Sequence, residues 1–383
     1  MTFTSRKTYT KNRLAISAIF FSYGLTFASW AARIPSIQSK FDLSEAGLGS
    51  LLIALPVGSF ISLPIAGYLV AKYGSKKITQ INVLAYSLSL FLIAFIPSVY
   101  AVGAMLFLFG FTGNSINVAI NTQAVDLGKL MKKPIMASFH GMWSLAGFGG
   151  AALGAVMIAY NLNLELHYGL VLAINLIVSL WAFSSLLHIK PTEEEKNAPT
   201  FVWPDKSLLL LGIIALCSML IEGTMFDWSG VYFKKVVHAP TQWVGLGYVA
   251  FMISMAGVRF VADKVTAVYG SKRIIMLSGI CSLVGLLLVI LLPHFYITII
   301  GFFIIGIGVS AVIPLVFDMA GNTQRMLPSI ALASVSTMGF FGFLVGPPII
   351  GFLAEALGLQ ISFSFIAFMA LLVIILASRL KRP

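Results

Sequence analysis

Long apolar stretches without charged residues, separated by short polar segments, dominate the chain. In the first half they cover residues 14–32, 46–71, 78–125, 134–164 and 166–189. In the second half they cover residues 207–233, which Glu222 and Asp227 interrupt, and residues 236–258, 274–317, 326–354 and 356–378. A helix needs about 20 apolar residues to cross a bilayer. Stretches of this length therefore predict membrane-spanning helices and not the short alternating segments of a membrane β-barrel.

Two of these stretches are long enough for two helices each. They contain Pro97-Ser98 and Pro293-His294, which are typical of a turn between antiparallel helices. Eight single and two double stretches give twelve spans. The first span follows a basic leader, but its apolar part is too long for a cleaved signal peptide. We therefore predict an all-α membrane protein with twelve transmembrane helices.

Composition agrees with burial in lipid. Hydrophobic residues make up 59% of the 383 residues and charged residues 10%, with a mean hydropathy of +0.97. Soluble domains are about half apolar and roughly a quarter charged. A water-soluble fold of this length could not hide so much apolar surface. Cys217 and Cys281 lie inside apolar stretches and are expected to be free, packed thiols.

The distribution of basic residues predicts the orientation in the membrane. The net charge is +12, but the positive charges sit in short loops between spans, which argues against a nucleic-acid partner. If the N-terminus is cytoplasmic, 20 Lys and Arg residues fall on the inner side and four on the outer side. The positive-inside rule therefore places both termini in the cytoplasm.

An internal repeat divides the chain in two. Residues 73–76 (Tyr-Gly-Ser-Lys) recur as residues 269–272, a displacement of 196 residues. Together with the span count, this predicts two pseudo-symmetric six-helix bundles, at residues 1–189 and 207–383, joined by a polar cytoplasmic linker at residues 190–206. Parallel bundles of this kind suit alternating access, in which one half rocks against the other around a site near the bilayer midplane.

Several motifs carry a family resemblance. The loop at residues 67–77 resembles the signature loop of the major facilitator superfamily, although Ala71 stands where an Asp is usual. Further matching stretches are Ala119-Ile-Asn121, His140-Gly-Met-Trp-Ser-Leu-Ala-Gly147, Glu222-Gly223, Asp227-Trp228, Arg259-Phe260 and Phe343-Leu-Val-Gly-Pro-Pro-Ile-Ile-Gly351. The chain resembles a YbjJ-like bacterial inner-membrane branch, distantly similar to fucose-type sugar permeases. The resemblance implies a transporter with the major facilitator fold.

Three asparagines share one face of the fourth predicted span. Asn114, Asn117 and Asn121 are spaced by three and four residues. Their amides would present donors and acceptors to a hydroxylated or amide-bearing solute. The alternative is that they bridge neighbouring helices. We predict that they line a solute cavity.

The first predicted span carries Thr26 and Arg33 on one polar face. Thr26 is counted among the predicted solute contacts. Arg33 lies near the outer end, where a basic side chain often extends to the interface. The pseudo-symmetry places Asp227 opposite Ser29 of this span. The sharper hypothesis is therefore an ion pair between Arg33 and Asp227 that closes the outer mouth.

Glu222 is the most informative polar residue, because it interrupts an otherwise apolar span. Burial disfavours the charged form of a carboxyl group, so Glu222 is a candidate for proton coupling. The alternatives are a direct ligand for solute hydroxyls and a structurally paired carboxylate.

Other candidates lie nearer the inner side. His140 is either a packing residue or part of the proton path or cavity wall, and Trp143 could stack on a sugar-like ring. Arg259, Asp263 and Asp318 are interpreted as a cytoplasmic gate or helix clamp and not as solute ligands.

No metal-ligand spacing, phosphate-binding loop or nucleophile–base pair is visible, so we expect neither a cofactor nor an enzyme. The predicted function is secondary active transport of a small polar, sugar-like solute across the bacterial inner membrane, driven by protons and carried out by a monomer. The alternatives are a proton-driven exporter of amphipathic compounds and a membrane sensor that binds a solute without moving it.

Overall fold

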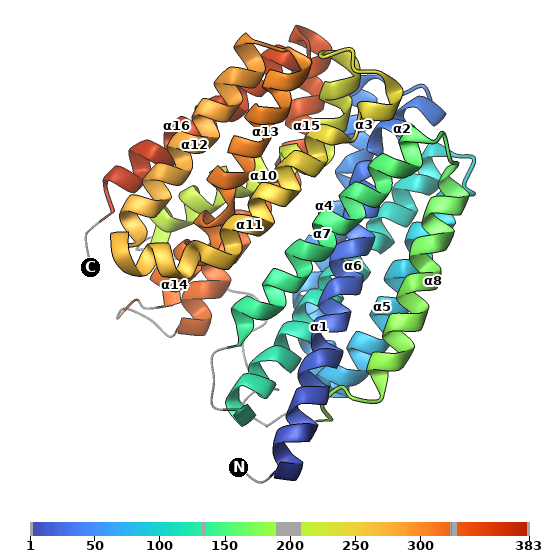
Figure 1. The fold of residues 1–383 in the computed structure, drawn as a ribbon, viewed down its shortest axis with the longest axis vertical. Helices are drawn as coiled ribbons and strands as arrows, with labels where there is room; N and C mark the ends of the chain where they lie inside the picture. Colours follow the sequence, from blue (N-terminus) through green and yellow to red (C-terminus); the bar gives the residue numbers. More distant parts are fainter. Residues whose placement is uncertain (1–2, 132–134, 189–207, 322, 324–327, 381–383) are drawn as a thin grey trace. The chain divides into compact units, whose positions relative to one another are not determined.

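The computed structural model describes residues 3–131, 135–188, 208–321, 323 and 328–380 (Figure 1). Within these residues every regular element is a helix, which confirms the all-α prediction. The helices of the first part are α1 (Phe3–Ala32), α2 (Ile34–Lys40), α3 (Glu45–Leu52), α4 (Ala54–Tyr73), α5 (Ser75–Ile93), α6 (Val99–Met131), α7 (Met136–Ala159) and α8 (Leu164–Phe183). Those of the second part are α10 (Leu209–Lys235), the short 3₁₀-helix η2 (Thr241–Trp243), α11 (Leu246–Tyr269), α12 (Ser271–Leu291), α13 (Phe295–Ser310), α14 (Val312–Gly321), α15 (Pro328–Leu357) and α16 (Leu359–Ser378).

Eleven helices within the described residues are long and apolar enough to cross a membrane. Helices α3 and α4 together make one of these spans, and α13 and α14 make another. The predicted twelfth span corresponds to α5, a 19-residue helix with two lysines in its first turn, which is not among these eleven. The two long stretches break between α5 and α6 and between α12 and α13, which confirms the predicted turns at Pro97 and Pro293.

The contacts group the chain into two compact units. The first contains Met1–Trp30, Ala54–Leu153 and Leu162–Phe201. The second contains Ala31–Ile53, Gly154–Asn161 and Val202–Pro383. The predicted division at residues 189 and 207 stays a prediction, and the predicted linker, residues 190–206, lies outside the described residues.

In the first unit, α4 and α5 both pack along α6, and α5 also packs against α8. Glycines let α4 and α6 approach closely, because a Cβ on Gly58 or Gly110 would collide with the backbone of the opposite helix. An aromatic contact supports the other side of α6, where the rings of Tyr86 and Phe109 stack with centroids 4.1 Å apart.

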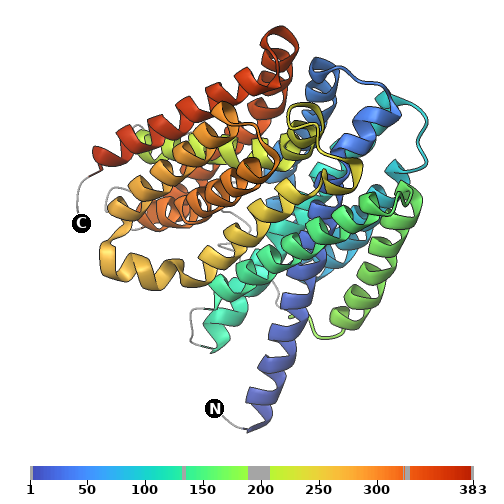
Figure 2. The same ribbon diagram turned by 45° about the horizontal axis from the view of Figure 1, so that its top comes forward.

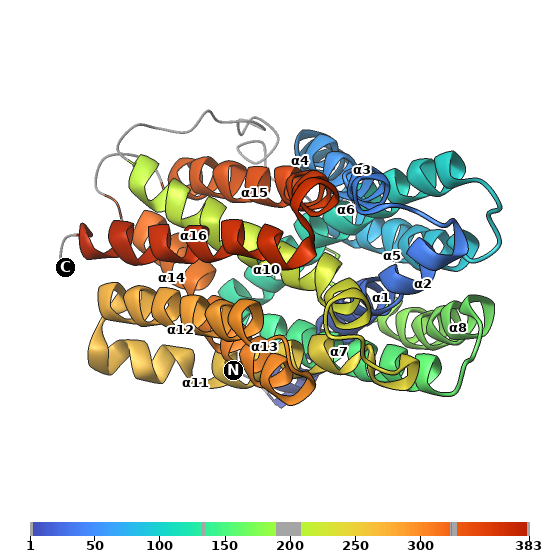
Figure 3. The same cartoon turned by 90° about the horizontal axis from the view of Figure 1, so that it is seen from above.

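In the second unit, α10 packs mainly against α15 and α16, while α12 lies beside α13 and α16 (Figure 3). Helix α11 packs against α13. The short helices α2 and α3 belong to this unit through their contacts with α10 and α15.

The repeated motif has the same backbone geometry in both copies. Gly74 has φ 84° and ψ 147°, and Gly270 has φ 78° and ψ 147°. Each is the residue directly before the helix that follows, α5 or α12. A positive φ of this size favours glycine over residues with a Cβ. The repeat at residues 73–76 and 269–272 therefore encodes one turn used twice.

Candidate functional site

A buried ion pair joins two helices of the second unit. Arg259 Nη2 on α11 lies 3.3 Å from Glu222 Oε1 on α10, and the two side chains are 17% and 7% exposed. Arg259 Nε also donates to the carbonyl of Ser310, at the end of α13, over 3.4 Å. One guanidinium thus connects three helices. The sequence interpretation grouped Arg259 with a cytoplasmic gate and did not predict its contact with Glu222.

Tyr248 completes a polar cluster around this pair. Its hydroxyl is buried and has no hydrogen-bond partner within the described residues, and its ring meets that of Phe226, the residue before Asp227 on α10, edge-on with centroids 6.3 Å apart. Asp227 is half-buried on α10. We call Glu222, Asp227, Tyr248 and Arg259 the Glu222 cluster. Sequence reasoning missed Tyr248, because a tyrosine in an apolar helix gives no signal of its own until its neighbours are known.

The hypothesised pair of Arg33 and Asp227 stays a prediction. Arg33 is buried, at 4% exposure, directly before α2, and its carbonyl accepts hydrogen bonds from Ser36 and Ile37. The ion pair that links this region to the end of α10 involves other residues. Lys235 Nζ lies 2.6 Å from Glu45 Oε1 at the start of α3.

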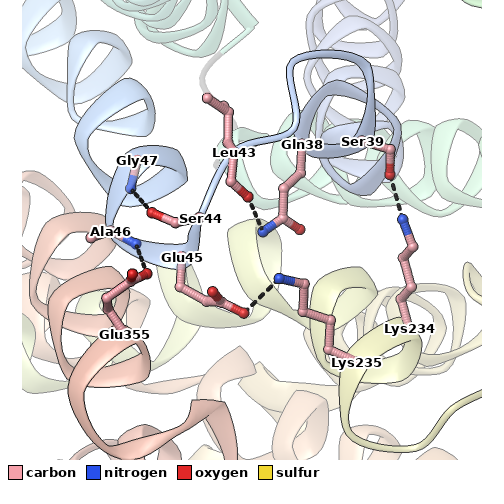
Figure 4. Close-up of polar contacts among 10 residues, drawn as sticks. All are labelled: Gln38, Ser39, Leu43, Ser44, Glu45, Ala46, Gly47, Lys234, Lys235 and Glu355. Atoms are coloured by element: carbon pink, nitrogen blue, oxygen red, sulfur yellow. Dashed lines mark hydrogen bonds and ion pairs between the residues drawn. The ribbon is translucent and has the colours of Figure 1, made fainter.

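Further polar contacts surround this ion pair (Figure 4). Lys234 donates to the hydroxyl of Ser39, and the backbone N–H of Ala46 donates to Glu355 Oε2 over 3.3 Å. Ser44 Oγ accepts from Gly47 N–H and so caps α3. We call residues 31–53, which these contacts tie to α10 and α15, the α2–α3 segment.

Backbone packing holds α3 against α15. A Cβ on Gly351 would lie 2.6 Å from the carbonyl oxygen of Glu45 and 2.9 Å from Gly49 Cα, and a Cβ on Gly49 would meet Pro347 and Gly351. The Glu45–Lys235 side chains are 21% and 38% exposed, and such pairs contribute about 0.2–1 kcal/mol. The glycine contact is therefore the stronger determinant of this arrangement.

The three asparagines of α6 have different surroundings. Asn114 is buried, at 4% exposure, and its Nδ2 has no partner within the described residues. Asn117 and Asn121 are half-buried, and Asn121 Nδ2 donates to the carbonyl oxygen and to Oδ1 of Asn117 over 2.7 and 2.8 Å. Asn117 and Asn121 thus form one amide pair, separate from the more deeply packed Asn114.

Thr26 belongs to a network between helices of the first unit. It is fully buried, donates to the carbonyl of Ser22, and accepts from Asn175 Nδ2 on α8 over 2.6 Å. The same Asn175 nitrogen donates to Ser87 on α5 over 3.0 Å. This placement favours a helix-bridging role for Thr26. Asn175 was not among the predicted residues.

His140 and Trp143 lie on α7 and contact aromatic rings of α1. The His140 ring meets Phe20 edge-on at 5.5 Å and the residue is exposed. Trp143 lies 6.2 Å from both Tyr23 and Phe27.

Two further residues were predicted to act with Arg259 as a cytoplasmic gate or helix clamp. Asp318 is exposed on α14, and the side chain of Asp263 lies outside the described residues. Their gating role stays a prediction.

Known proteins are similar to this chain in sequence and in fold. The family model of the Major Facilitator Superfamily matches residues 14–325. The uncharacterized transporter y4wD of Sinorhizobium fredii is 34% identical over 369 residues, which cover 96% of this chain and 97% of that protein. An uncharacterized MFS-type transporter of Yersinia pestis is 32% identical over 356 residues, which cover 92% of this chain and 92% of that protein.

A solved structure gives the same result for the fold. A mutant of the nucleoside transporter NupG superposes with a TM-score of 0.76 at 15% identity, covering 96% of this chain and all of that one. At this identity the likeness shows the fold alone. The sequence matches, the repeat and the membrane-spanning helices lead to one conclusion: the chain belongs to the Major Facilitator Superfamily and is a multi-pass membrane transporter of small solutes.

Proposed function

We propose that this protein is a proton-coupled secondary transporter of a small, hydroxylated, sugar-like solute. The observation that carries the proposal is the ion pair of Glu222 and Arg259, 3.3 Å apart in an otherwise apolar part of α10. Ionisable residues inside membrane spans are costly and are typically found on ion or solute pathways.

The proton step follows from the energetics of buried ion pairs. The cost of removing two charges from water largely cancels their attraction, so such a pair adds little net stability. Protonation of Glu222 removes its attraction to Arg259 and leaves the guanidinium without its charged partner, which is costly in a buried pair. Neutral Glu222 and released Arg259 then favour a different arrangement of α10 and α11, and this difference couples proton binding to a conformational change. The buried hydroxyl of Tyr248, which has no hydrogen-bond partner within the described residues, is our candidate for the group that passes the proton on.

The solute class rests on the first unit. The amide pair of Asn117 and Asn121 keeps donor and acceptor capacity beyond its internal hydrogen bonds. Trp143 supplies an aromatic face, which suits the apolar side of a sugar ring. Glu222 as a direct ligand for solute hydroxyls is the competing assignment, and the experiment below separates the two.

The location and orientation are part of the proposal. The excess of basic residues on one side of the predicted spans places both termini in the cytoplasm. The bacterial relatives fit an inner-membrane protein. Arg33 and Asp227 are proposed to act at the outer mouth, Arg259 and Asp318 on the inner side.

The test uses protein reconstituted in liposomes with an internal pH-sensitive dye. Sugars, amino acids, nucleosides and amphipathic cations are added in turn, with and without an imposed proton gradient. We expect proton movement that depends on one solute class, and gradient-driven uptake of that solute. Glu222→Gln should abolish gradient-driven uptake while solute exchange at equal pH continues, because only the proton carrier is lost.

Glu165→Gln is the matched control, since this carboxylate lies in the first turn of α8, far along the chain from the Glu222 cluster. It should transport normally. Loss of exchange as well as uptake in Glu222→Gln would make Glu222 a solute ligand. Unchanged gradient-driven uptake would refute proton coupling through Glu222. Solute binding without any flux would identify a sensor, and proton-driven movement of amphipathic cations alone would identify an exporter.

A further inference from the structure

An apolar groove runs between three helices of the first unit. It is lined by Leu14, Ser17, Ala18 and Phe21 of α1, Met142 of α7, and Ile177, Val178 and Trp181 of α8, and its volume is about 510 Å³. The lining residues of α1 follow a spacing of three and four, so they form one face of that helix. Figure 2 shows the start of α1, in dark blue, beside α7 and α8, in blue-green and green.

One end of this groove is polar. Arg13 Nη2 on α1 donates to Ser138 Oγ on α7 over 3.2 Å. Asn12 Nδ2 donates to the carbonyl of Ser185, just after α8, over 2.7 Å. The first contact bridges α1 to α7 and the second bridges α1 to the chain after α8.

Helical spacing places both contacts directly at the groove end. Arg13 precedes the lining residue Ser17 by four positions, and Ser138 precedes Met142 by four. Residues four apart lie one above the other on a helix. The guanidinium of Arg13 therefore lies one turn beyond the apolar lining, at the end nearer the N-terminus, and it is exposed.

The same end has the features of a membrane–water boundary. Trp181 is 60% exposed there, and tryptophan is enriched at the interface with the lipid headgroups. Lys11, also exposed, adds a second positive charge near Arg13. An apolar groove that ends in exposed positive charge at headgroup level matches a molecule with an acyl chain and an anionic head.

We propose that this groove binds one phospholipid with an anionic headgroup. One acyl chain lies along Phe21 and Ile177, and the phosphate contacts Arg13, whose planar guanidinium suits phosphate oxygens. Basic sites between helices near the membrane surface are the kind of place where anionic lipids bind specifically. The inference concerns the first unit alone and does not depend on proton coupling or on the solute.

The test compares two lipids with identical acyl chains, phosphatidylglycerol and phosphatidylcholine, by native mass spectrometry of the detergent-purified full chain. We expect one tightly bound phosphatidylglycerol, preferred over phosphatidylcholine. Arg13→Gln should lower the affinity for phosphatidylglycerol about fivefold, because one basic residue near the surface contributes roughly 1 kcal/mol. It should leave phosphatidylcholine binding unchanged.

Lys77→Gln is the matched control, since Lys77 is also exposed and basic but lies on α5, away from the groove lining. An equal loss of affinity in Lys77→Gln would mean general surface attraction and would overturn the proposal. Ala18→Trp fills the groove and should weaken binding of both lipids. Photocrosslinking with a diazirine in the acyl chain tests the position of the bound lipid without any variant. Labelling of residues 14–21 or 177–181 would support lipid binding in the groove. Labelling of other residues only, or a second copy of the chain in the groove in place of lipid, would overturn the proposal.

Discussion

Polar residues inside the spans have two different surroundings, which differ in the partners of each side chain. Thr26, Ser87 and Asn175 satisfy one another inside the first unit. Within the part of the chain that the structure describes, Glu222 instead forms an ion pair with Arg259, and the half-buried Asn117 and Asn121 hydrogen-bond to each other. In a bilayer, side chains of the first kind hold helices together, and we propose that those of the second kind serve the solute or the proton.

This difference predicts opposite effects for two asparagines. Asn175→Ala leaves the buried hydroxyls of Thr26 and Ser87 without this donor, which should lower the free energy of unfolding by about 1–3 kcal/mol. Asn121→Ala removes a half-buried amide and should instead weaken solute binding with little loss of stability. Thermal unfolding and equilibrium exchange of the identified solute, measured on both variants, check this. A destabilised Asn121→Ala with normal solute affinity would assign Asn121 to packing.

At the scale of elements, glycine decides how closely helices approach. The contact of α3 with α15 brings two backbones together at Gly49 and Gly351, with no room for a Cβ. The polar contacts around Glu45 and Lys235 are more exposed and contribute less. Close backbone packing therefore contributes more than the ion pair to holding the α2–α3 segment in place.

Gly351→Ala should release α3 from α15, because its new Cβ would meet backbone atoms that cannot rotate away. The readout is thiol labelling of Leu48→Cys, a position that is fully buried on α3. Labelling should become faster when Gly351→Ala is added.

Gly346→Ala, on the same helix, is the control, since its Cβ would meet only Leu220 Cγ at 3.9 Å. It should leave the labelling rate unchanged. Equal rates in both variants would show that the glycine contact does not hold the segment.

At the scale of the whole molecule, charge in the loops sets the orientation and apolar length sets the spans. The basic residues are spread over many connections that are predicted to lie on the inner side, so no single residue determines the predicted topology. We expect both termini in the cytoplasm.

A fluorescent protein that matures only in the cytoplasm, fused to the C-terminus, should fluoresce, and alkaline phosphatase at the same place should stay inactive. The reverse pattern would contradict the predicted orientation. Fusion of the same reporters after Pro97, in a predicted outer turn, provides the control and should give the opposite result.

Much of the fold was predictable because its causes are local in the sequence. The turn between α5 and α6 follows from Pro97, and the repeated turns before α5 and α12 follow from Gly74 and Gly270. For the candidate site residues, the sequence indicated which polar residues stand out but not which side chains they contact. Glu222 is conspicuous in an apolar span, but its partner Arg259 is 37 residues away, and no spacing rule relates two residues at that distance. The three asparagines share one helix face, and this likewise concealed that Asn114 is more deeply packed.

The sequence by itself determined that the chain is a helical membrane protein, that it is built from a repeat, and which residue types stand out in the lipid phase. These properties depend on the apolar length, charge and turn residues of short segments. Only the tertiary structure decided that Glu222 meets Arg259 beside Tyr248, that Thr26 is satisfied by Asn175, and that α3 rests on Gly351. Each of these contacts joins segments distant in the chain, and which side chains meet across packed helices depends on how those helices fit together.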